Sequence, residues 1–600
     1  MFKRIRELDV SSWPRPLALL FRRMDLVLCF LSLAGSALWF QKVYYAAALN
    51  RQLLIWLPLD LAWPLVLTGI AALLPRLARH IYMGALGTAL FILSIVHGVY
   101  FNMFRKFFSF SDMGFAGDGL AFLDPSYLRI RKLAILLGLL CLLAMIAGIV
   151  LCPREEKGRR PLPRLIGGAA AVAVGAAACL WATAPLREGG GLVIWDMDTD
   201  PSTIYENFTD TRGAMAAVGL YQYTFRDLQL ALFPSGGSLS QEERAEVDAF
   251  AQARPHQDNE LTGALAGKNL ILIQLEAIDT WMVDYMPALK AVKEHSVVFA
   301  NHYTPAYITA GTFNTEFMVN TGLLPAATGT PTSVYTRNSF PRSLARLFQE
   351  KGYTANSYHG SEGEVYMRGS IHPNWGYTYH SGNDMGMPNY TMDSQLMCAY
   401  DDMTAGNPFL TFIVTYSGHG PYGEGNPIYQ AHADEAWAEA ARTDGKYIYA
   451  VAHSKETDLF VKELMERLEA DGMLENTVVA FYADHNNYYM LDDELLMDIK
   501  GVDNLNMLQH TDFFIYSKDL EPRTVEKYTS SIDVLPTLAN LFGLDADYGL
   551  MAGDDAFGPE GGYVFFNDNT WTGAAGDAAA EILRRREINA LILKGDYWKQ

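Results

Sequence analysis

The hydrophobic residues divide the chain into two parts with different patterns. Five long apolar stretches fill the first 184 residues, and each is close to the roughly 20 residues that a helix needs to cross a bilayer. They are Leu26–Ala48, Leu53–Leu74, Ile81–Met103, Leu133–Leu151 and Leu165–Ala184. Buried core helices or a cleaved signal peptide explain the pattern poorly, because the five stretches follow one another with short basic or polar loops between them. The pattern predicts a five-helix transmembrane domain over residues 1–184.

Beyond residue 267 the apolar runs become short and alternate with amphipathic segments. The predicted strands are Leu270–Leu275, Tyr353–Tyr358, Phe409–Thr415, Val478–Tyr482, Phe513–Tyr516 and Gly562–Asn567, and the predicted helices include Pro341–Glu350, Tyr449–Asp471 and Asp533–Phe542. Buried strands that alternate with helices are typical of an α/β domain with a mostly parallel sheet. We expect this domain to cover residues 268–600. Residues 185–267 are predicted to form a juxtamembrane helical linker, which includes a helix over Gln241–Arg254 with Ser240 as its N-cap.

The charges are distributed unevenly, and this predicts the orientation of the chain. Residues 1–184 carry 20 Lys and Arg against 9 Asp and Glu, whereas the remaining residues are strongly acidic. The basic residues concentrate at the N-terminus and in two loops that lie on one side of the membrane, which is therefore predicted to be cytoplasmic. Five spans place the acidic domain outside. Its charge argues against nucleic acid as a partner. Its single cysteine, Cys398, excludes an internal disulfide and fits a bacterial surface.

Residues that can bind a metal ion follow two of the predicted strands. Glu276 ends the first strand, and Asp484 and His485 follow Val478–Tyr482 after a single alanine. Ligands of open α/β sheets bind at the carboxyl ends of the strands, and carboxylate oxygen and imidazole nitrogen both bind divalent ions. Taken alone, Asp484 and His485 are explained as readily by a pair of surface residues at a strand end as by a metal site. Together with Glu276 they predict a metal-dependent enzyme.

Thr312 is the candidate nucleophile. It stands where a loop is predicted to enter a helix, within Ala310-Gly311-Thr312-Phe313. The free N–H groups and the dipole of a helix N-terminus favour an alkoxide and the phosphoryl group that it attacks. Threonine acts as a covalent nucleophile once a base or a metal activates it. N-capping by Thr309 or Thr312 is the commoner role of such a residue and stays open as the alternative.

Three further polar residues follow predicted strands. His419 lies between two glycines after Phe409–Thr415, where it suits substrate binding or general acid catalysis. His359 ends the Tyr353–Tyr358 strand. Arg368, in the next loop, can recognise a phosphate through two parallel hydrogen bonds. A structural histidine and an ordinary surface arginine are the alternatives.

The order of these segments resembles the sulfatase-like branch of the alkaline phosphatase superfamily. The resemblance rests on Glu276, Gly311-Thr312-x-x-x-Glu316-Phe317, His419, Asp484-His485, His510–Tyr516 and Ser531–Leu538, which occur in this order. With five predicted spans before the domain, the whole chain is similar to the lipoteichoic acid synthase family. The resemblance implies that Thr312 becomes phosphoglycerylated and that Glu276, Thr312, Asp484 and His485 hold one Mn2+ or Mg2+. It also implies that His419 contacts the glycerol-phosphate group, that Arg368 binds phosphate, that Tyr366 lines the pocket and that His359 supports it.

The implied activity is phosphoglycerol transfer at the bacterial cell surface, from phosphatidylglycerol to a glycolipid or polyglycerol-phosphate acceptor. The chain departs from the family around the nucleophile, where the family often has Gly-Lys-Thr-Ser-Asp, at Tyr366, where it usually has Trp, and at Asn486-Asn487. Transfer of phosphoethanolamine or of a single phosphoglycerol to a glycan or lipid is therefore the alternative. A non-catalytic membrane-anchored scaffold is a third possibility. A sulfatase is disfavoured, because Thr312–Glu316 lacks the Cys/Ser-x-Pro-x-Arg context.

Overall fold

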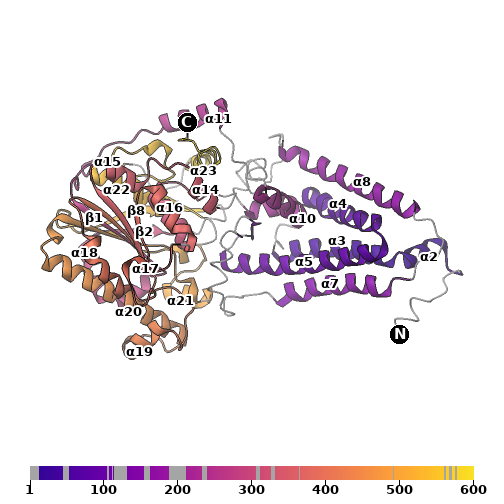
Figure 1. Cartoon of the computed structure of the whole chain (residues 1–600), viewed down its shortest axis with the longest axis horizontal. Helices are drawn as coiled ribbons and strands as arrows, with labels where there is room; N and C mark the ends of the chain where they lie inside the picture. The colour runs from indigo at the N-terminus through magenta and orange to yellow at the C-terminus, as the bar shows by residue number, and fades with distance from the viewer. Residues whose placement is uncertain are drawn as a thin grey trace. The chain divides into compact units, whose positions relative to one another are not determined.

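Figure 1 shows the computed structural model of the chain. It describes residues 12–44, 53–104, 107–110, 113, 132–153, 162–187, 211–232, 239–305, 311–325, 331–363, 365–490, 492–559, 562–566, 570–573 and 578–599. The chain divides into a helical unit, Met1–Ser111 with Leu128–Pro234, and a mixed unit, Ser235–Gln600 with Asp112–Tyr127.

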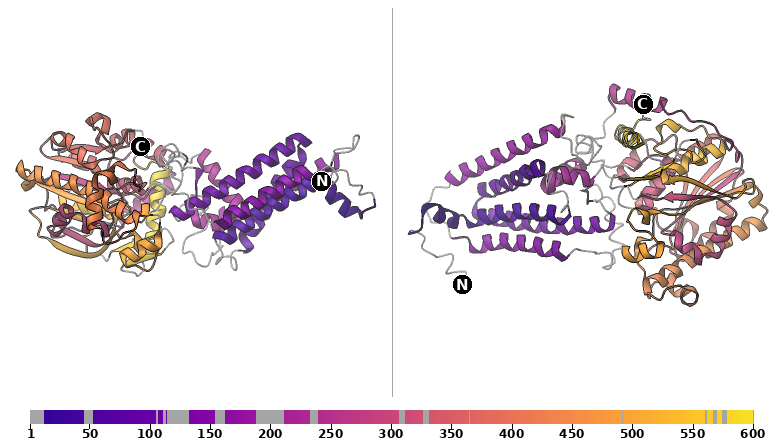
Figure 2. Two further views of the ribbon diagram at one scale, coloured as in Figure 1. Left: turned by 90° about the horizontal axis from the view of Figure 1, so that it is seen from below. Right: turned by 180° about the vertical axis from the view of Figure 1, so that it is seen from behind.

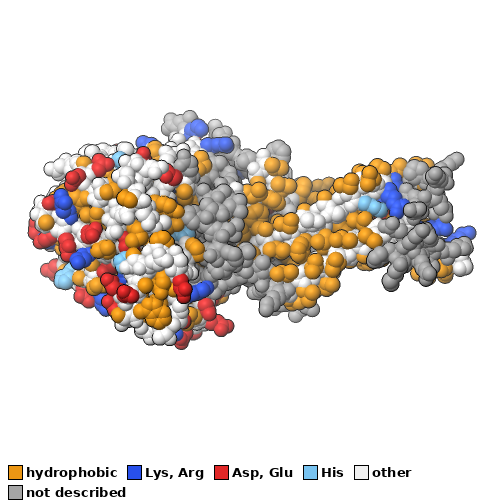
Figure 3. Space-filling view, turned by 60° about the horizontal axis from the view of Figure 1, so that its bottom comes forward, with side chains coloured by type: hydrophobic (Ala, Val, Ile, Leu, Met, Phe, Trp, Pro, Cys, Tyr) orange, Lys and Arg blue, Asp and Glu red, His pale blue; other side chains and the backbone are white. Residues whose placement is uncertain are grey.

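The five apolar stretches all form helices in the helical unit. They are α3 (Met24–Tyr44), α4 (Leu53–Leu73), α5 (Arg76–Phe104), α7 (Lys132–Leu151) and α8 (Leu162–Arg187), and α2 (Arg15–Arg22) precedes them. Hydrophobic side chains cover the visible surface of these helices (Figure 3), and Leu31, Leu136 and Trp181 are among those exposed. Such a continuous apolar exterior is expected for helices that contact lipid.

Two of these helices are long and apolar enough to cross a bilayer over their described residues. They are Arg76–Phe101 of α5 and Leu162–Ala184 of α8, whereas the apolar parts of α3, α4 and α7 are shorter, at 10–17 residues. The structure therefore contains the five predicted helices. That all five of them span the membrane stays a prediction.

Two helices, α10 and α11, lie in the described part of the predicted linker. α10 (Thr211–Leu232) belongs to the helical unit, packs against α4 and is kinked at Gly219, which has φ 74° and ψ 175°. α11 (Gln241–Gln252) belongs to the mixed unit and confirms the predicted helix that begins after Ser240. Ser240 Oγ accepts a hydrogen bond from the backbone N–H of Glu243 at 3.1 Å, and the Glu243 carboxylate accepts one from the backbone N–H of Ser240. These reciprocal bonds form a capping box.

The mixed unit is built around an eight-stranded sheet with the order β4-β3-β5-β1-β6-β7-β2-β8. The strands are β1 (Asn269–Leu275), β2 (Val297–Tyr303), β3 (Thr354–His359), β4 (Thr378–His380), β5 (Phe409–Val414), β6 (Thr477–Ala483), β7 (Phe513–Tyr516) and β8 (Arg523–Ser530). Only β7 runs antiparallel to its neighbours. The mostly parallel α/β sheet is therefore confirmed.

Five of the described strands differ from the prediction. The predicted strand Gly562–Asn567 forms β9 (Tyr563–Phe565), which pairs with β10 (Trp571–Gly573) in a separate antiparallel sheet, and Asn567 lies outside the described residues. β2, β4, β8 and β10 were not predicted. β2 carries polar residues within its run, and β8 lies at the sheet edge with mostly exposed or half-exposed side chains. Neither therefore has the continuous apolar run that marks a fully buried strand.

Helices cover both faces of the large sheet (Figure 2). On one face Leu270 and Leu272 of β1 pack with α13 (Gly311–Thr321), α15 (Leu344–Glu350), α16 (Arg368–Trp375), α22 (Val534–Phe542) and α23 (Ala578–Lys594). On the other face Ile271 and Ile273 pack with α12 (Pro287–Glu294), α18 (Tyr400–Met403), α20 (Gly445–Ala470) and α21 (Asp493–Lys500). The remaining helices are α14 (Pro331–Arg337), α17 (Gly382–Met385) and α19 (Pro427–Glu439). The alternation along β1 shows a strand buried on both faces, so its functional residues can lie only at its end.

Candidate active site

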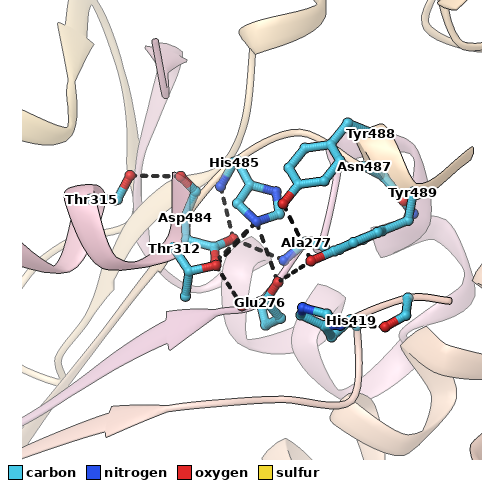
Figure 4. Close-up of polar contacts among 12 residues, drawn as sticks. Glu276, Ala277, Thr312, Thr315, His419, Asp484, His485, Asn487, Tyr488 and Tyr489 are labelled. Atoms are coloured by element: carbon cyan, nitrogen blue, oxygen red, sulfur yellow. Dashed lines mark hydrogen bonds and ion pairs between the residues drawn. The ribbon is translucent and has the colours of Figure 1, made fainter. Parts of the chain in front are cut away.

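The carboxyl ends of β1 and β6 bring Glu276, Asp484 and His485 together. The two strands are parallel neighbours whose register pairs Leu275 with Ala483, so the residues that follow emerge at the same level of the sheet. One ligand atom from each of the three residues lies within 4.8 Å of the other two, and all three side chains are buried. His485 Nε2 is 3.3 Å from Glu276 Oε1 and 3.3 Å from Asp484 Oδ2 (Figure 4). The predicted cluster of strand-end residues therefore exists.

The backbone around Glu276 is shaped to hold Asp484. Ala277 has a φ of 52°, a left-handed conformation that costs free energy for a residue other than glycine. Its N–H donates to Asp484 Oδ1 at 2.8 Å, and the N–H of His485 donates to the same oxygen at 2.8 Å. Gly418 passes so close that a Cβ there would lie 1.8 Å from the Glu276 carbonyl oxygen. Only glycine fits this approach.

Thr312 reaches the cluster from the first turn of α13. Its Oγ1 donates to Glu276 Oε2 at 3.0 Å and lies 3.3 Å from His485 Nε2. Gln274 of β1 fixes this turn, because its Nε2 donates to the Thr312 carbonyl at 3.1 Å. Tyr482 of β6 in turn donates to Gln274 Oε1 at 2.8 Å. The hydroxyl is thus directed into the cluster from a rigid support at a helix N-terminus.

The four residues fit a divalent cation. Two carboxylates, an imidazole and a hydroxyl are the hard and borderline donors that Mn2+ and Mg2+ bind. Asp484 Oδ2 is buried and has no hydrogen-bond partner within the described part of the chain, an arrangement that costs free energy unless a cation lies nearby. His485 Nδ1 is 2.9 Å from the carbonyl of Asn486, which assigns the hydrogen to Nδ1 and directs a lone pair of Nε2 toward the carboxylates. The arrangement is a possible metal site.

Protons compete with a cation for this site. Burial alone would lower the pKa of His485, but the Asp484 and Glu276 carboxylates outweigh burial and raise it to about 9. Burial and the charge of Glu276 raise the pKa of Asp484. In the absence of a cation, a proton therefore occupies the cluster at neutral pH.

We expect the affinity for Mn2+ to increase with pH up to about 9, because the His485 imidazolium must lose its proton to bind the ion. One displaced proton corresponds to an affinity gain of about tenfold per pH unit. Calorimetric titration of the full-length protein between pH 6 and 8, in two buffers of different ionisation enthalpy, measures both the affinity and the released proton. An affinity that does not change over this range, without proton release, would show that His485 is not a ligand.

His419 lies beside the cluster, on the loop that follows β5. Asp393 fixes this loop by accepting hydrogen bonds from the backbone N–H groups of Tyr416, at 2.7 Å, and Ser417, at 3.1 Å. The His419 ring packs between Tyr416 and Tyr489, with ring centroids 5.2 and 4.7 Å away. Burial lowers the pKa of His419, which makes it a neutral imidazole at physiological pH.

Two tyrosines at the site were not predicted. Tyr489 donates from its hydroxyl to Glu276 Oε1 at 3.5 Å, and the Tyr488 ring lies 4.4 Å from the His485 ring. Both follow the Asp484-His485 pair by only a few residues, and this closeness in sequence is the signal that could have identified them. Figure 4 shows both hydroxyls directed toward the cluster.

Arg368 and Tyr366 contact α13 rather than the metal-binding cluster, and His359 contacts the end of β5. Arg368 is buried and donates from Nε and Nη2 to the carboxylate of Glu316, at distances of 2.9 to 3.1 Å. Tyr366 stacks on Phe313 with ring centroids 5.3 Å apart, and the Arg368 guanidinium lies over Tyr366. His359 Nδ1 is 2.9 Å from the carbonyl of Val414, and burial lowers its pKa to about 3. Glu316 was recognised only as part of a motif, and its partner was not predicted.

Comparisons with known proteins show what the domain that carries this site is similar to. Residues 268–544 match the family model Sulfatase. Lipoteichoic acid synthase 2 of Bacillus subtilis is 24% identical over 342 residues, which cover 52% of this chain and 51% of that protein. Lipoteichoic acid synthase of Staphylococcus aureus is 23% identical over 342 residues, which cover 53% and 52%. The chain thus matches about half the length of these curated relatives.

A solved structure, the lipoteichoic acid synthase LtaP from Listeria monocytogenes, aligns with a TM-score of 0.45 and 18% identity. The alignment covers 58% of this chain and 96% of that one. Residues 268–544 are thus similar to the Sulfatase family, and the chain is similar in sequence to the lipoteichoic acid synthases.

Proposed function

We propose that this chain, which is related through its sulfatase domain to the lipoteichoic acid synthases, is a metal-dependent phosphoglycerol transferase. The observation that carries the proposal is the Thr312 hydroxyl, held 3.0 Å from Glu276 and 3.3 Å from His485 within a four-residue donor set. A hydroxyl aimed at two metal-type ligands from a helix N-terminus is arranged for attack on phosphorus. A non-catalytic scaffold has no need of this arrangement.

The reaction has two transfers at phosphorus. Oγ1 of Thr312 forms a bond to the phosphorus of phosphatidylglycerol while the bond to the diacylglycerol oxygen breaks, and the proton of the Thr312 hydroxyl passes to that departing oxygen. His419 contacts the glycerol-phosphate group and assists this proton transfer, so that neutral diacylglycerol leaves and the phosphoglycerol group stays on Thr312. A hydroxyl of the acceptor then attacks this phosphorus, the bond to Thr312 Oγ1 breaks, and the acceptor's proton passes to Oγ1 to regenerate Thr312. A bound Mn2+ or Mg2+ would lower the pKa of the hydroxyl and neutralise charge on the phosphate.

A lipid donor explains why the domain is attached to apolar helices. We propose that residues 1–184 anchor the enzyme through five spans, that residues 185–267 form the juxtamembrane linker and that residues 268–600 lie outside the cell. The acceptor is then a glycolipid or a growing polyglycerol-phosphate chain. Tyr366 stands at the position where lipoteichoic acid synthases usually carry Trp. Because of this difference, transfer of phosphoethanolamine or of a single phosphoglycerol is the second candidate.

Purified full-length protein tests the proposal when it is incubated with Mn2+ and headgroup-labelled phosphatidylglycerol. We expect release of diacylglycerol and a ladder of labelled products. A single product would indicate one-step transfer. Turnover of labelled phosphatidylethanolamine in place of phosphatidylglycerol would establish the second candidate and contradict the first.

A further inference from the structure

Three helices of the helical unit bring a carboxylate, an imidazole and a thiol together at one end. Asp25 lies in the first turn of α3, His80 lies near the start of α5, and Cys152 directly follows the end of α7. α7 packs against both α3 and α5 (Figure 1). One ligand atom from each of the three residues lies within 4.8 Å of the other two.

Asp25 has one buried oxygen that lacks a hydrogen-bond partner. Its Oδ2 accepts a hydrogen bond from Arg79 Nε at 2.8 Å and lies 3.4 Å from His80 Nε2. Its Oδ1 is buried and has no hydrogen-bond partner among the described residues, an arrangement that costs free energy. A cation at Oδ1 would supply the missing partner and leave the bond to Arg79 intact. Carboxylates that bind metal ions are commonly oriented by such a hydrogen bond.

The three donor types favour zinc. Thiolate, imidazole and carboxylate together are ligands of tetrahedral Zn2+ sites, whereas Mg2+ and Mn2+ prefer oxygen. Bonds of about 2.0 to 2.3 Å in such a site place the ligand atoms about 3.3 to 3.8 Å apart. The 3.4 Å between His80 Nε2 and Asp25 Oδ2 lies within this range. Cys152 is buried, but the His80 side chain is 16% exposed, so an ion can reach the group from that side.

We propose that Asp25, His80 and Cys152 bind one Zn2+ ion, which joins α3, α5 and α7 at this end of the helical unit. Helices in lipid gain little from hydrophobic association, so bonds to a shared ion help to hold them together. The topology proposed above puts this end in the cytoplasm, where thiols stay reduced. Zn2+ binds the thiolate, so Cys152 releases its proton when the ion binds. The site lies in the helical unit and does not depend on phosphoglycerol transfer.

Co2+ is the probe, because a bond between Co2+ and a thiolate absorbs in the near ultraviolet and Zn2+ is spectroscopically silent. Purified full-length protein is freed of metal and titrated with Co2+. We expect a charge-transfer band to develop, and added Zn2+, which thiolate ligands favour, to abolish it. The candidate active site contains no cysteine and cannot produce this band. Absence of the band in the wild type would overturn the proposal.

Cys152→Ser should abolish the band, and Cys29→Ser is its matched control. Cys29 is a second buried cysteine of the helical unit, one turn along α3 from Asp25, and it does not belong to the group of three. The control should keep the wild-type band. A band that persists in Cys152→Ser, or that disappears in Cys29→Ser instead, would contradict the assignment of Cys152 as the sulfur ligand.

His80→Gln covers the case in which Cys152→Ser fails to fold, because the His80 side chain is partly exposed and its replacement should leave the helices packed. We expect this variant to bind Zn2+ about tenfold or more weakly, measured by competition with Co2+ for the thiolate band. An unchanged affinity would mean that His80 is not a ligand. Asp25 and Arg79 would then form an ordinary buried ion pair, and the proposal would be wrong.

Discussion

Replacement of Thr312 with alanine is expected to lower transfer from phosphatidylglycerol by about a thousandfold or more, the size of loss seen when a covalent nucleophile is removed. The physical reason is that the side chain supplies the only hydroxyl that lies 3.0 Å from Glu276 and 3.3 Å from His485 among the described residues. Diacylglycerol release from headgroup-labelled lipid measures the loss. The folded structure should persist, because the change removes two small groups from a helix whose first turn is held by Gln274 through the backbone.

Thr312→Ser is the matched control, because it keeps the hydroxyl and removes only a methyl group. We expect this variant to retain measurable transfer and to form the same products. Full activity of Thr312→Ala, or equal loss in the serine and alanine variants, would mean that the hydroxyl is not the nucleophile.

Asp484→Asn is expected to weaken Mn2+ binding by about a hundredfold or more, since loss of residues that merely support metal ligands already costs 10- to 100-fold. The amide can still accept the two backbone hydrogen bonds that Asp484 Oδ1 receives from Ala277 and His485. What disappears is the charged Oδ2, which faces the cluster without a hydrogen-bond partner among the described residues. Transfer should fall in parallel with metal occupancy.

Thermal unfolding separates lost metal binding from a damaged fold. At a Mn2+ concentration 100 times the dissociation constant, binding stabilises the wild type by about 2.7 kcal/mol. The wild type should therefore melt at a higher temperature with Mn2+ than with a chelator, whereas Asp484→Asn, with at least a hundredfold weaker affinity, should gain at most about 0.4 kcal/mol and melt at nearly the same temperature in both. A Mn2+-dependent shift as large in the variant as in the wild type would remove Asp484 from the ligand set.

The metal-binding cluster could be predicted from sequence because its geometry follows from strand direction. Glu276 and Asp484 each end a continuous apolar run, and parallel neighbours carry the residues after such runs to one edge of the sheet. The register that pairs Leu275 with Ala483 completes the argument. The position of Thr312 could be predicted for a related reason, since glycine and threonine at the start of a predicted helix indicate a helix N-terminus.

The partners of Arg368 could not be predicted in this way. Glu316 lies 52 residues away in sequence, and the two side chains meet only because α13 and α16 pack on the same face of the sheet. A prediction from residue type alone assigned phosphate binding to Arg368. It did not include the Glu316 carboxylate, which already accepts hydrogen bonds from the guanidinium. The edge strand β8 was not predicted for a different reason. Its side chains are largely solvated, and its sequence lacks the apolar run of a buried strand.

Trapping of the covalent intermediate tests the central claim most directly. Full-length protein, Mn2+ and headgroup-labelled phosphatidylglycerol are mixed without acceptor and quenched in acid, and the labelled peptide is identified by mass spectrometry. The account predicts a phosphoglycerol group on Thr312, formed with one equivalent of diacylglycerol and absent from Thr312→Ala. Diacylglycerol release with no label on the protein, or label on another residue, would contradict it.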